Sequence, residues 1–320
     1  MQTNNSLKAP ELTLIIPACN EACGILTFLD QLHTALSGCC TDFEVVVIDD
    51  GSRDKTWALI SDAAARFDWL HCLRFTRNFG KEAAILAGLR HSRGRAVVVM
   101  DADGQHPPEL LPSLLAPWRS GSAHIVAAQK KLGAVTLASR FNTYTFNRLM
   151  YALTGLDLAN ASDYRLLDRA VVDTLLSFPE KVRFFRGMTA WTGFTTKQVE
   201  FEVAPRIAGT SQWSAGQLTR LAIVAITGYS SKPLGMIFWL GMFGMVAALL
   251  LFIQALYSWF SGTAVSGWSS LTAVILFFGS ANLLGVGVLG AYLAQIFDEI
   301  KKRPEYILLE KTEPANGPLE

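Results

Sequence analysis

The stretch RAVVVMDADGQ, residues 95–105, joins a run of branched apolar residues to two aspartates and a glycine. A short valine-rich run is typical of a strand that is buried on both faces of a parallel sheet. The polar residues that follow mark the loop beyond the carboxyl end of that strand. Ligands of open α/β sheets bind at this position. The stretch therefore predicts a fold class and also the place of the functional site.

Two earlier segments show the same pattern of an apolar run followed by polar residues. The apolar run Leu12–Ile16 leads into PACNE, and Phe43–Ile48 leads into Asp49-Asp50-Gly51-Ser52. Stretches with helical character lie between the predicted strands, at about 24–36, 55–66 and 81–91. Alternating strands and helices predict an α/β doubly wound sheet. The polar motifs at the three strand ends should then meet at one edge.

The predicted edge is rich in carboxylates and lacks the usual phosphate-binding loops. No GxGxxG follows the first strand and no GxxxxGK[ST] occurs, so neither a dinucleotide site nor a P-loop is supported. Carboxylates would repel a phosphate ligand unless a divalent cation lay between them. Asp103 with Gln105, joined by Asp101, offers the hard oxygen ligands that Mg²⁺ or Mn²⁺ prefers. An Asp pair by itself often only caps a loop, but its position at a strand end favours the metal.

The C-terminal third carries a different signal. Charged residues make up 17% of the 320 residues, yet none occurs from Pro233 to Phe297. Two segments within this gap, 234–257 and 268–297, are long enough to cross a bilayer. Lysine and arginine flank the pair and are missing from the link, which predicts that both termini are cytosolic. The alternative is a hairpin buried in a soluble core.

Three further features bear on partners. Residues 211–231 have the periodicity of an amphipathic helix, suited either to a membrane surface or to ordinary core packing. Small residues recur four apart in both apolar segments, which favours close helix packing, either within the hairpin or in a homo-oligomer. The net charge of +1 argues against a general nucleic-acid binder.

At this point the motifs resemble a known family. The segments PACNE (17–21), IDDGS (48–52), RNFGK (77–81) and DADGQ (101–105) are similar to the successive signatures of family 2 glycosyltransferases with a GT-A fold. SDYRL (162–166), the RxxGxS pattern of 206–211, the two apolar segments and KRPEY (302–306) narrow the resemblance to polyprenyl-phosphate glycosyltransferases. These include bactoprenol glucosyltransferases and, more distantly, dolichol-phosphate mannose synthases. The resemblance covers roughly residues 10–310.

The resemblance implies a role for each matching residue. The expected nucleotide-binding residues are Pro17, Cys19, Glu21, Asp50 and Asp101. Asp101, Asp103 and Gln105 should hold Mg²⁺ or Mn²⁺ with the diphosphate, and Lys130, Arg140 and Arg206 should meet the acceptor phosphate. Asp163 and Asp103 are the expected catalytic acids, and Asp163 either takes part in the chemistry or orients the sugar hydroxyls.

The implied activity is metal-dependent, inverting transfer of a hexose from a nucleoside-diphosphate sugar to undecaprenyl phosphate at the cytosolic face of the inner membrane. UDP-glucose is the expected donor, with GDP-mannose or a modified sugar as the alternatives. A polysaccharide synthase or a non-catalytic membrane scaffold is less favoured. The expected parts are a GT-A domain with a doubly wound mixed sheet (1–210), an amphipathic helix (211–232), a hairpin of two transmembrane helices (233–298) and a cytosolic tail (299–320).

Overall fold

The computed structural model describes residues 9–130, 148, 161–181, 183–201, 230, 232–261 and 267–312. These residues belong to two compact units. The first, the sheet unit, holds the described residues up to Arg148, those from 161 to 201, and the segment from Arg303 onward. The second, the helical unit, holds the described residues from Ser230 to Lys302.

The sheet unit is built on one eight-stranded mixed sheet with the order β7-β5-β6-β4-β1-β2-β3-β8. β1, β2, β3 and β4 are parallel neighbours, β6 runs antiparallel to β4 and to β5, and β7 is parallel to β5. The strands are β1 Leu12–Ala18, β2 Phe43–Asp49, β3 Leu70–Phe75, β4 Ala96–Val99, β5 Ile125–Lys130, β6 Ala161–Asp168, β7 Thr196–Phe201 and β8 Leu308–Lys311. The predicted α/β class with a mixed sheet is confirmed.

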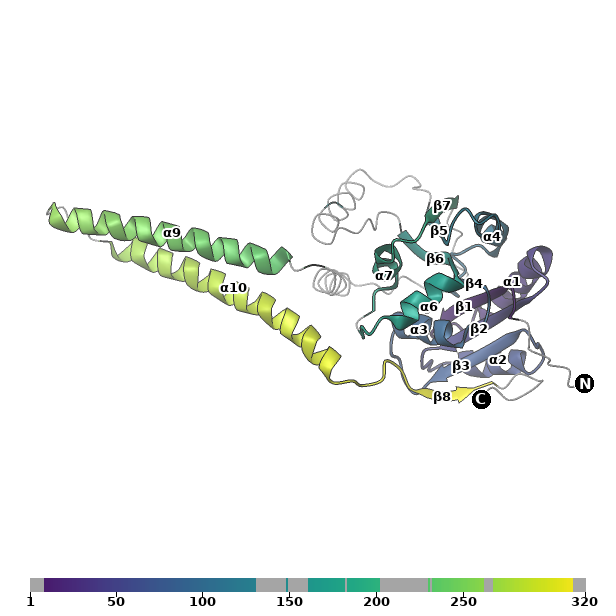
Figure 1. Cartoon of the computed structure of the whole chain (residues 1–320). Coiled ribbons are helices and arrows are strands. Elements are labelled where there is room, and N and C mark those ends of the chain that lie inside the picture. Colours follow the sequence, from purple (N-terminus) through teal and green to yellow (C-terminus); the bar gives the residue numbers. More distant parts are fainter. Residues whose placement is uncertain are drawn as a thin grey trace, which may run out of the picture. The chain divides into compact units, whose positions relative to one another are not determined.

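Helices cover both faces of this sheet (Figure 1). One face carries α1 Ile25–Cys39, α2 Thr56–Ala64, the short 3₁₀ turn η1 Pro108–Leu110 and α4 Leu111–Arg119. The other carries α3 Lys81–His91, α6 Arg169–Ser177 and α7 Phe185–Trp191. The three helical stretches expected between the first strands correspond to α1, α2 and α3.

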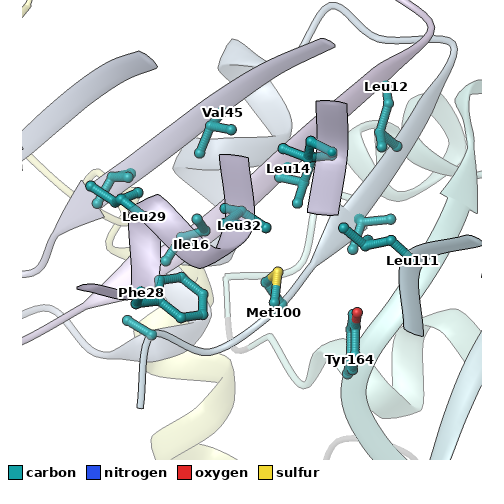
Figure 2. Close-up of a cluster of buried hydrophobic side chains, with 14 of the residues drawn as sticks. Leu12, Leu14, Ile16, Phe28, Leu29, Leu32, Val45, Met100, Leu111 and Tyr164 are labelled. Atoms are coloured by element: carbon teal, nitrogen blue, oxygen red, sulfur yellow. The ribbon is translucent and has the colours of Figure 1, made fainter. Parts of the chain in front are cut away.

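The main core lies between α1 and the central strands. Figure 2 shows Phe28, Leu29 and Leu32 of α1 beside Leu14 and Ile16 of β1, all of them buried. Burying such aliphatic and aromatic side chains removes apolar surface from water, at about 25 cal/mol per Å². Every second residue of β1 faces this cluster, so the intervening ones face the opposite layer.

On that opposite layer, α3 approaches the sheet closely at Gly88. A Cβ added to Gly88 would lie 2.3 Å from Cγ2 of Ile15 on β1. Only glycine allows this approach, which seats the whole of α3 against the sheet. The position of α3 matters because its first residue is Lys81.

The chain after the apolar segments returns to the sheet. β8 pairs antiparallel with β3, so it forms one edge of the sheet. Neither β3 nor β8 is among the strands that the sequence pattern predicts, and β8 lies in the segment 299–320, which is predicted as a cytosolic tail. Pairing covers one side of β3, which would otherwise expose unpaired backbone groups.

The helical unit consists of α9 Lys232–Phe260 and α10 Trp268–Ile300. Both helices are long and apolar enough to cross a membrane, by length and composition. A Cβ on Gly244 of α9 would meet the ring of Phe278 at 2.6 Å, and one on Gly285 of α10 would lie 3.3 Å from Ile237. These two small residues therefore serve packing within the hairpin. Apart from Ser230 and Lys232, the expected amphipathic helix 211–232 lies outside the described residues.

Candidate active site

Strand directions bring the predicted site residues to one edge of the sheet. β1, β2 and β4 are parallel, so the loops that follow them leave from the same edge. β6 runs antiparallel to β4, with Val99 opposite Arg165, so β6 begins where β4 ends. Asp163, the third residue of β6, is therefore placed beside the loop that starts at Asp101.

A cluster of two acids and two cations occupies this edge. Nζ of Lys81 lies 2.5 Å from Oδ1 of Asp101 and 2.7 Å from Oδ2 of Asp163. Arg186 of α7 donates from Nε to Oδ1 of Asp163 at 2.6 Å and from Nη2 to Oδ2 at 2.9 Å. We call Lys81, Asp101, Asp163 and Arg186 the edge cluster. Asp163 accepts charge-assisted bonds from both cations, and its two bonds from the Arg186 guanidinium form a bidentate pair.

The edge cluster keeps Asp163 ionised. Burial alone would raise the pKa of Asp163, but the charges and hydrogen bonds of Lys81 and Arg186 prevail and hold that pKa well below its usual range. Burial opposes the charge on Lys81 as well, yet Asp163 and Asp101 raise the pKa of the Lys81 ammonium above its ordinary value. A carboxylate with so low a pKa has little tendency to take up a proton.

Glu82, the residue after Lys81 on α3, has a raised pKa, in contrast to Asp163. Burial, reinforced by the nearby charge of Asp163, raises the pKa of Glu82 to about 7, although the backbone N–H of Phe185 donates to its Oε2 at 2.9 Å. That hydrogen bond ties α3 to the start of α7, which carries Arg186. Glu82 thus links the two helices that supply the cations of the edge cluster.

Asp50 holds the loop that leads into Lys81. Its Oδ1 accepts the N–H of Phe79 at 2.6 Å, and its Oδ2 accepts the N–H of Gly80 at 2.9 Å. The Asp50 side chain is buried, and this burial raises its pKa despite the two N–H donors. Gly51 makes the fit possible, because it has φ 64° and a Cβ there would lie 2.3 Å from the carbonyl carbon of Arg77. We refer to residues 76–80 as the 76–80 loop.

The nucleotide-binding residues expected after β1 contact the 76–80 loop and the start of α2. Cys19 accepts an N–H from the Asn78 side chain at 3.3 Å, and the Glu21 N–H donates to Oγ1 of Thr56 at 2.9 Å. Pro17 lies within β1. Burial raises the pKa of the Cys19 thiol, so it stays protonated at neutral pH.

The Asp-Ala-Asp loop is held in shape by a buried histidine. Nδ1 of His106 accepts the Asp101 N–H at 2.9 Å, and Nε2 of His106 lies 3.1 Å from Oγ of Ser162. The His106 ring also stacks on Tyr164, with ring centroids 4.9 Å apart. Since Nδ1 accepts, the ring proton belongs on Nε2, and Ser162 is its acceptor. His106 therefore locks the loop after β4 to the start of β6.

The donor set in this loop fits a divalent cation that shares its coordination with a ligand. Asp101, Asp103 and Gln105 are all partly exposed, and Oδ1 of Asp103 accepts the Gln105 N–H at 3.0 Å, which curls the loop. Among the described residues, no three His, Cys, Asp or Glu side chains gather closely enough to enclose a metal ion. Mg²⁺ typically takes one or two carboxylates and completes its shell with substrate phosphates and water.

The structure describes only one of the three residues expected to meet the acceptor phosphate. Lys130 ends β5, and Gln129 beside it pairs with Ala161, so Lys130 reaches the edge at which β6 begins. Arg140 and Arg206 lie outside the described residues. In contrast, Lys81 and Arg186 belong to the edge cluster and Glu82 links their helices, although the sequence patterns predict no role for these three residues. Lys81 is the last residue of the RNFGK motif, and that motif is the sequence feature from which Lys81 could be identified.

Sequence and structure comparisons identify relatives along most of the chain. The sequence profile of glycosyl transferase family 2 matches residues 13–176. The bactoprenol glucosyl transferase of Shigella phage SfV is 34% identical over 303 residues, covering 93% of this chain and 98% of that protein. The prophage bactoprenol glucosyl transferase homolog of Escherichia coli is also 34% identical, over the same shares of both chains.

A solved structure is similar to part of this chain at lower identity. The glucosyl-3-phosphoglycerate synthase of Mycobacterium tuberculosis, solved with Mn²⁺, UDP-glucose and phosphoglyceric acid, is 21% identical with a TM-score of 0.48. The match covers 69% of this chain and 79% of that one. The family profile spans β1 to α6, including every motif that forms the edge cluster except Arg186. The chain belongs to glycosyl transferase family 2.

Proposed function

We propose that this protein transfers a hexose from a nucleoside-diphosphate sugar to a polyprenyl phosphate. The carrying observation is the edge cluster, in which two acids from neighbouring strand ends are bridged by Lys81 at the ligand-binding edge of the sheet. The two phage-type relatives, which are named as bactoprenol glucosyl transferases, support a lipid acceptor and favour UDP-glucose as the donor.

The loops after β1, β2 and β4 would bind the donor. Pro17, Cys19, Glu21 and Asp50 would line its nucleotide, with Asp50 acting through the 76–80 loop that it holds. Asp101, Asp103 and Gln105 would hold Mg²⁺ or Mn²⁺. When bound, such an ion neutralises the charge that develops on the departing diphosphate.

Asp163 acts as an electrostatic anchor in this proposal and not as a general base. The acceptor phosphate has a second pKa of about 6, as other phosphate monoesters do, so at pH 7 it is mostly a dianion and already nucleophilic. Asp163 is committed to Lys81 and Arg186, and its lowered pKa makes it a poor proton acceptor. Its contribution is to hold both cations where negative charge moves during transfer. Attack from the face opposite the diphosphate would invert the anomeric carbon.

The acceptor would be met at the membrane. Lys130, Arg140 and Arg206 are the proposed phosphate contacts, since lysine and arginine both bind phosphate well. The two apolar helices α9 and α10 would anchor the enzyme in the inner membrane, with both termini in the cytosol. An enzyme held there meets the charged head of a lipid whose tail stays in the bilayer.

The test is a transfer assay with purified protein in detergent. UDP-glucose or GDP-mannose is supplied with undecaprenyl phosphate and Mg²⁺ or Mn²⁺, and the lipid product is identified by mass. We expect one hexose on the lipid with UDP-glucose, loss of product in Asp103→Ala, and full activity in Asp62→Ala, which removes an exposed acid of α2. A lengthening product would indicate a polysaccharide synthase. No product from either nucleotide sugar would refute hexose transfer from these two donors, and no release of nucleoside diphosphate from any donor would favour a scaffold.

A further inference from the structure

The segment Glu305–Thr312, here called the strap, contacts the sheet unit at several points. Beyond the pairing of β8 with β3, the Thr76 N–H donates to the carbonyl of Ile307 at 3.1 Å. The Thr312 N–H donates to the carbonyl of Cys72 at 2.9 Å, and the Cys72 N–H donates to Oγ1 of Thr312 at 2.8 Å. The strap begins five residues after the end of α10. Its first part therefore lies against the end of β3, where the 76–80 loop starts.

Tyr306 connects the strap to that loop through aromatic contacts. Its ring stacks on the buried ring of Phe75, with centroids 5.0 Å apart and an angle of 15° between the planes. Phe75 in turn meets Phe79 edge to face at 5.7 Å. Phe79 donates its N–H to Asp50, and Lys81 follows two residues later. A continuous chain of packed rings thus runs from the strap to Phe79, two residues before the start of α3.

The strap also contacts the C-terminal end of α3. The guanidinium of Arg90, in the last turn of α3, lies 5.5 Å from the Tyr306 ring centroid and 3.3 Å from Oε1 of Glu305. Lys81 is the first residue of α3, so the strap restrains this helix through the loop at its start and through a side chain near its end. A merely edge-covering strand would need neither contact.

We propose that Tyr306, supported by Glu305, is a positioning residue of the active site. It fixes the 76–80 loop and α3 so that Lys81 sits between Asp101 and Asp163. The expected effect on turnover rests on the proposed function, whereas the expected effect on the 76–80 loop does not. Coupling of this kind is carried by contiguous packed side chains, and it requires a direct measurement of coupling.

The first experiment measures amide hydrogen exchange of the segment 76–82 in the full-length protein in detergent. In Tyr306→Leu, which removes the ring stack but keeps an apolar side chain, exchange in this segment should become about three- to tenfold faster. Tyr306→Phe keeps the ring and should restore the slow rate. The matched control is Trp57→Phe, which removes the hydrogen bond from Trp57 Nε1 to Glu310 at the other end of the strap. Unchanged exchange in Tyr306→Leu, or equal acceleration in the control, would overturn the proposal.

The second experiment is a double-mutant cycle on turnover with UDP-glucose and undecaprenyl phosphate. Tyr306→Leu should lower kcat about three- to tenfold and change KM for the donor less. In a Lys81→Met background the same change should cost little more, because its effect passes through Lys81. Fully multiplicative losses would contradict that route. If the unaltered protein transfers no sugar, the proposed function is wrong while the exchange result still decides whether the strap holds the loop.

Discussion

Replacing Asp163 by Asn tests the electrostatic reasoning most directly. The carboxylate accepts three bonds, one from Lys81 and two from Arg186, at 2.6 to 2.9 Å. An amide has only one acceptor oxygen, so its NH₂ group must face a charged donor. The substitution therefore keeps the shape of the side chain, removes its charge and sets donor against donor.

The size of the effect follows from the burial of the three groups. Removing one partner of a fully buried ion pair costs about 3 to 5 kcal/mol. Here the side chains of Lys81 and Arg186 are 36% and 37% exposed, so both can turn toward water and recover part of their hydration. We expect the free energy of unfolding to fall by about 2 kcal/mol. We expect transfer to fall about 100-fold, equivalent to about 2.7 kcal/mol in the barrier.

The measurement combines urea unfolding in detergent with the transfer assay at matched amounts of folded protein. Asp168→Asn is the control, because Asp168 lies on the same strand but caps α6 and accepts from the Trp118 side chain. The amide can accept only one of the two N–H groups, from Trp118 and Ala170, that the carboxylate accepts. The variant should therefore lose about 1 kcal/mol of stability, the typical net contribution of one hydrogen bond, and keep its rate per folded molecule. If Asp163→Asn unfolds as the unaltered protein does and transfers at more than half its rate, the edge cluster does not have the role assigned to it.

Four further outcomes follow. Asp103→Ala should abolish transfer at saturating Mg²⁺ while membrane extraction and the melting temperature stay unchanged; persistent activity would remove Asp103 from the metal site. The raised pKa of Glu82 disfavours its charged form, so it costs stability as pH rises from about 4.5 to about 7. Glu82→Gln should therefore gain relative stability between pH 5 and pH 8, by at most about 3 kcal/mol, and a constant difference in urea unfolding would contradict this. Gly51→Ala should destabilise the protein by about 2 kcal/mol or more, because its Cβ would press on the backbone of Arg77, and thermal unfolding measures this. The transfer rate should fall below about pH 6 as the acceptor phosphate takes up a proton. The residual activity of Asp163→Asn should still fall below about pH 6. If that fall were lost in the variant, Asp163 would be the titrating group.

The sequence predicted the half of the site that depends on local pattern. Valine-rich strands followed at once by acids specify both a parallel sheet and its functional edge, so Asp50, Asp101 and Asp103 could be found without coordinates. β3 was missed because LHCLRF interrupts its apolar residues with His71 and Arg74. β8 was missed because four residues of mixed character, LLEK, become a strand only by pairing with an edge far away in the sequence.

The two cations of the edge cluster could not be predicted from local pattern, for a different physical reason. Lys81 opens a helix and Arg186 lies within another, and either residue read alone looks like a solvated surface charge. Their roles arise from the reversal of β6, which brings Asp163 within reach of a lysine 82 residues earlier and an arginine 23 residues later. Such a meeting depends on the order and direction of strands, which short-range periodicity does not contain.

The charge balance of the edge cluster also suggests how the site responds to its donor. In the described structure two carboxylates face two cations, so Lys81 satisfies Asp101 as well as Asp163. A divalent ion on Asp101 would repel the Lys81 ammonium from the shared oxygen, since like charges so close are strongly unfavourable. Lys81 would then keep Asp163 and gain the diphosphate oxygens brought in with the ion. With the proposed ion bound, the lysine that pairs with both acids would stabilise the leaving group, provided that Asp163 stays ionised and holds it there.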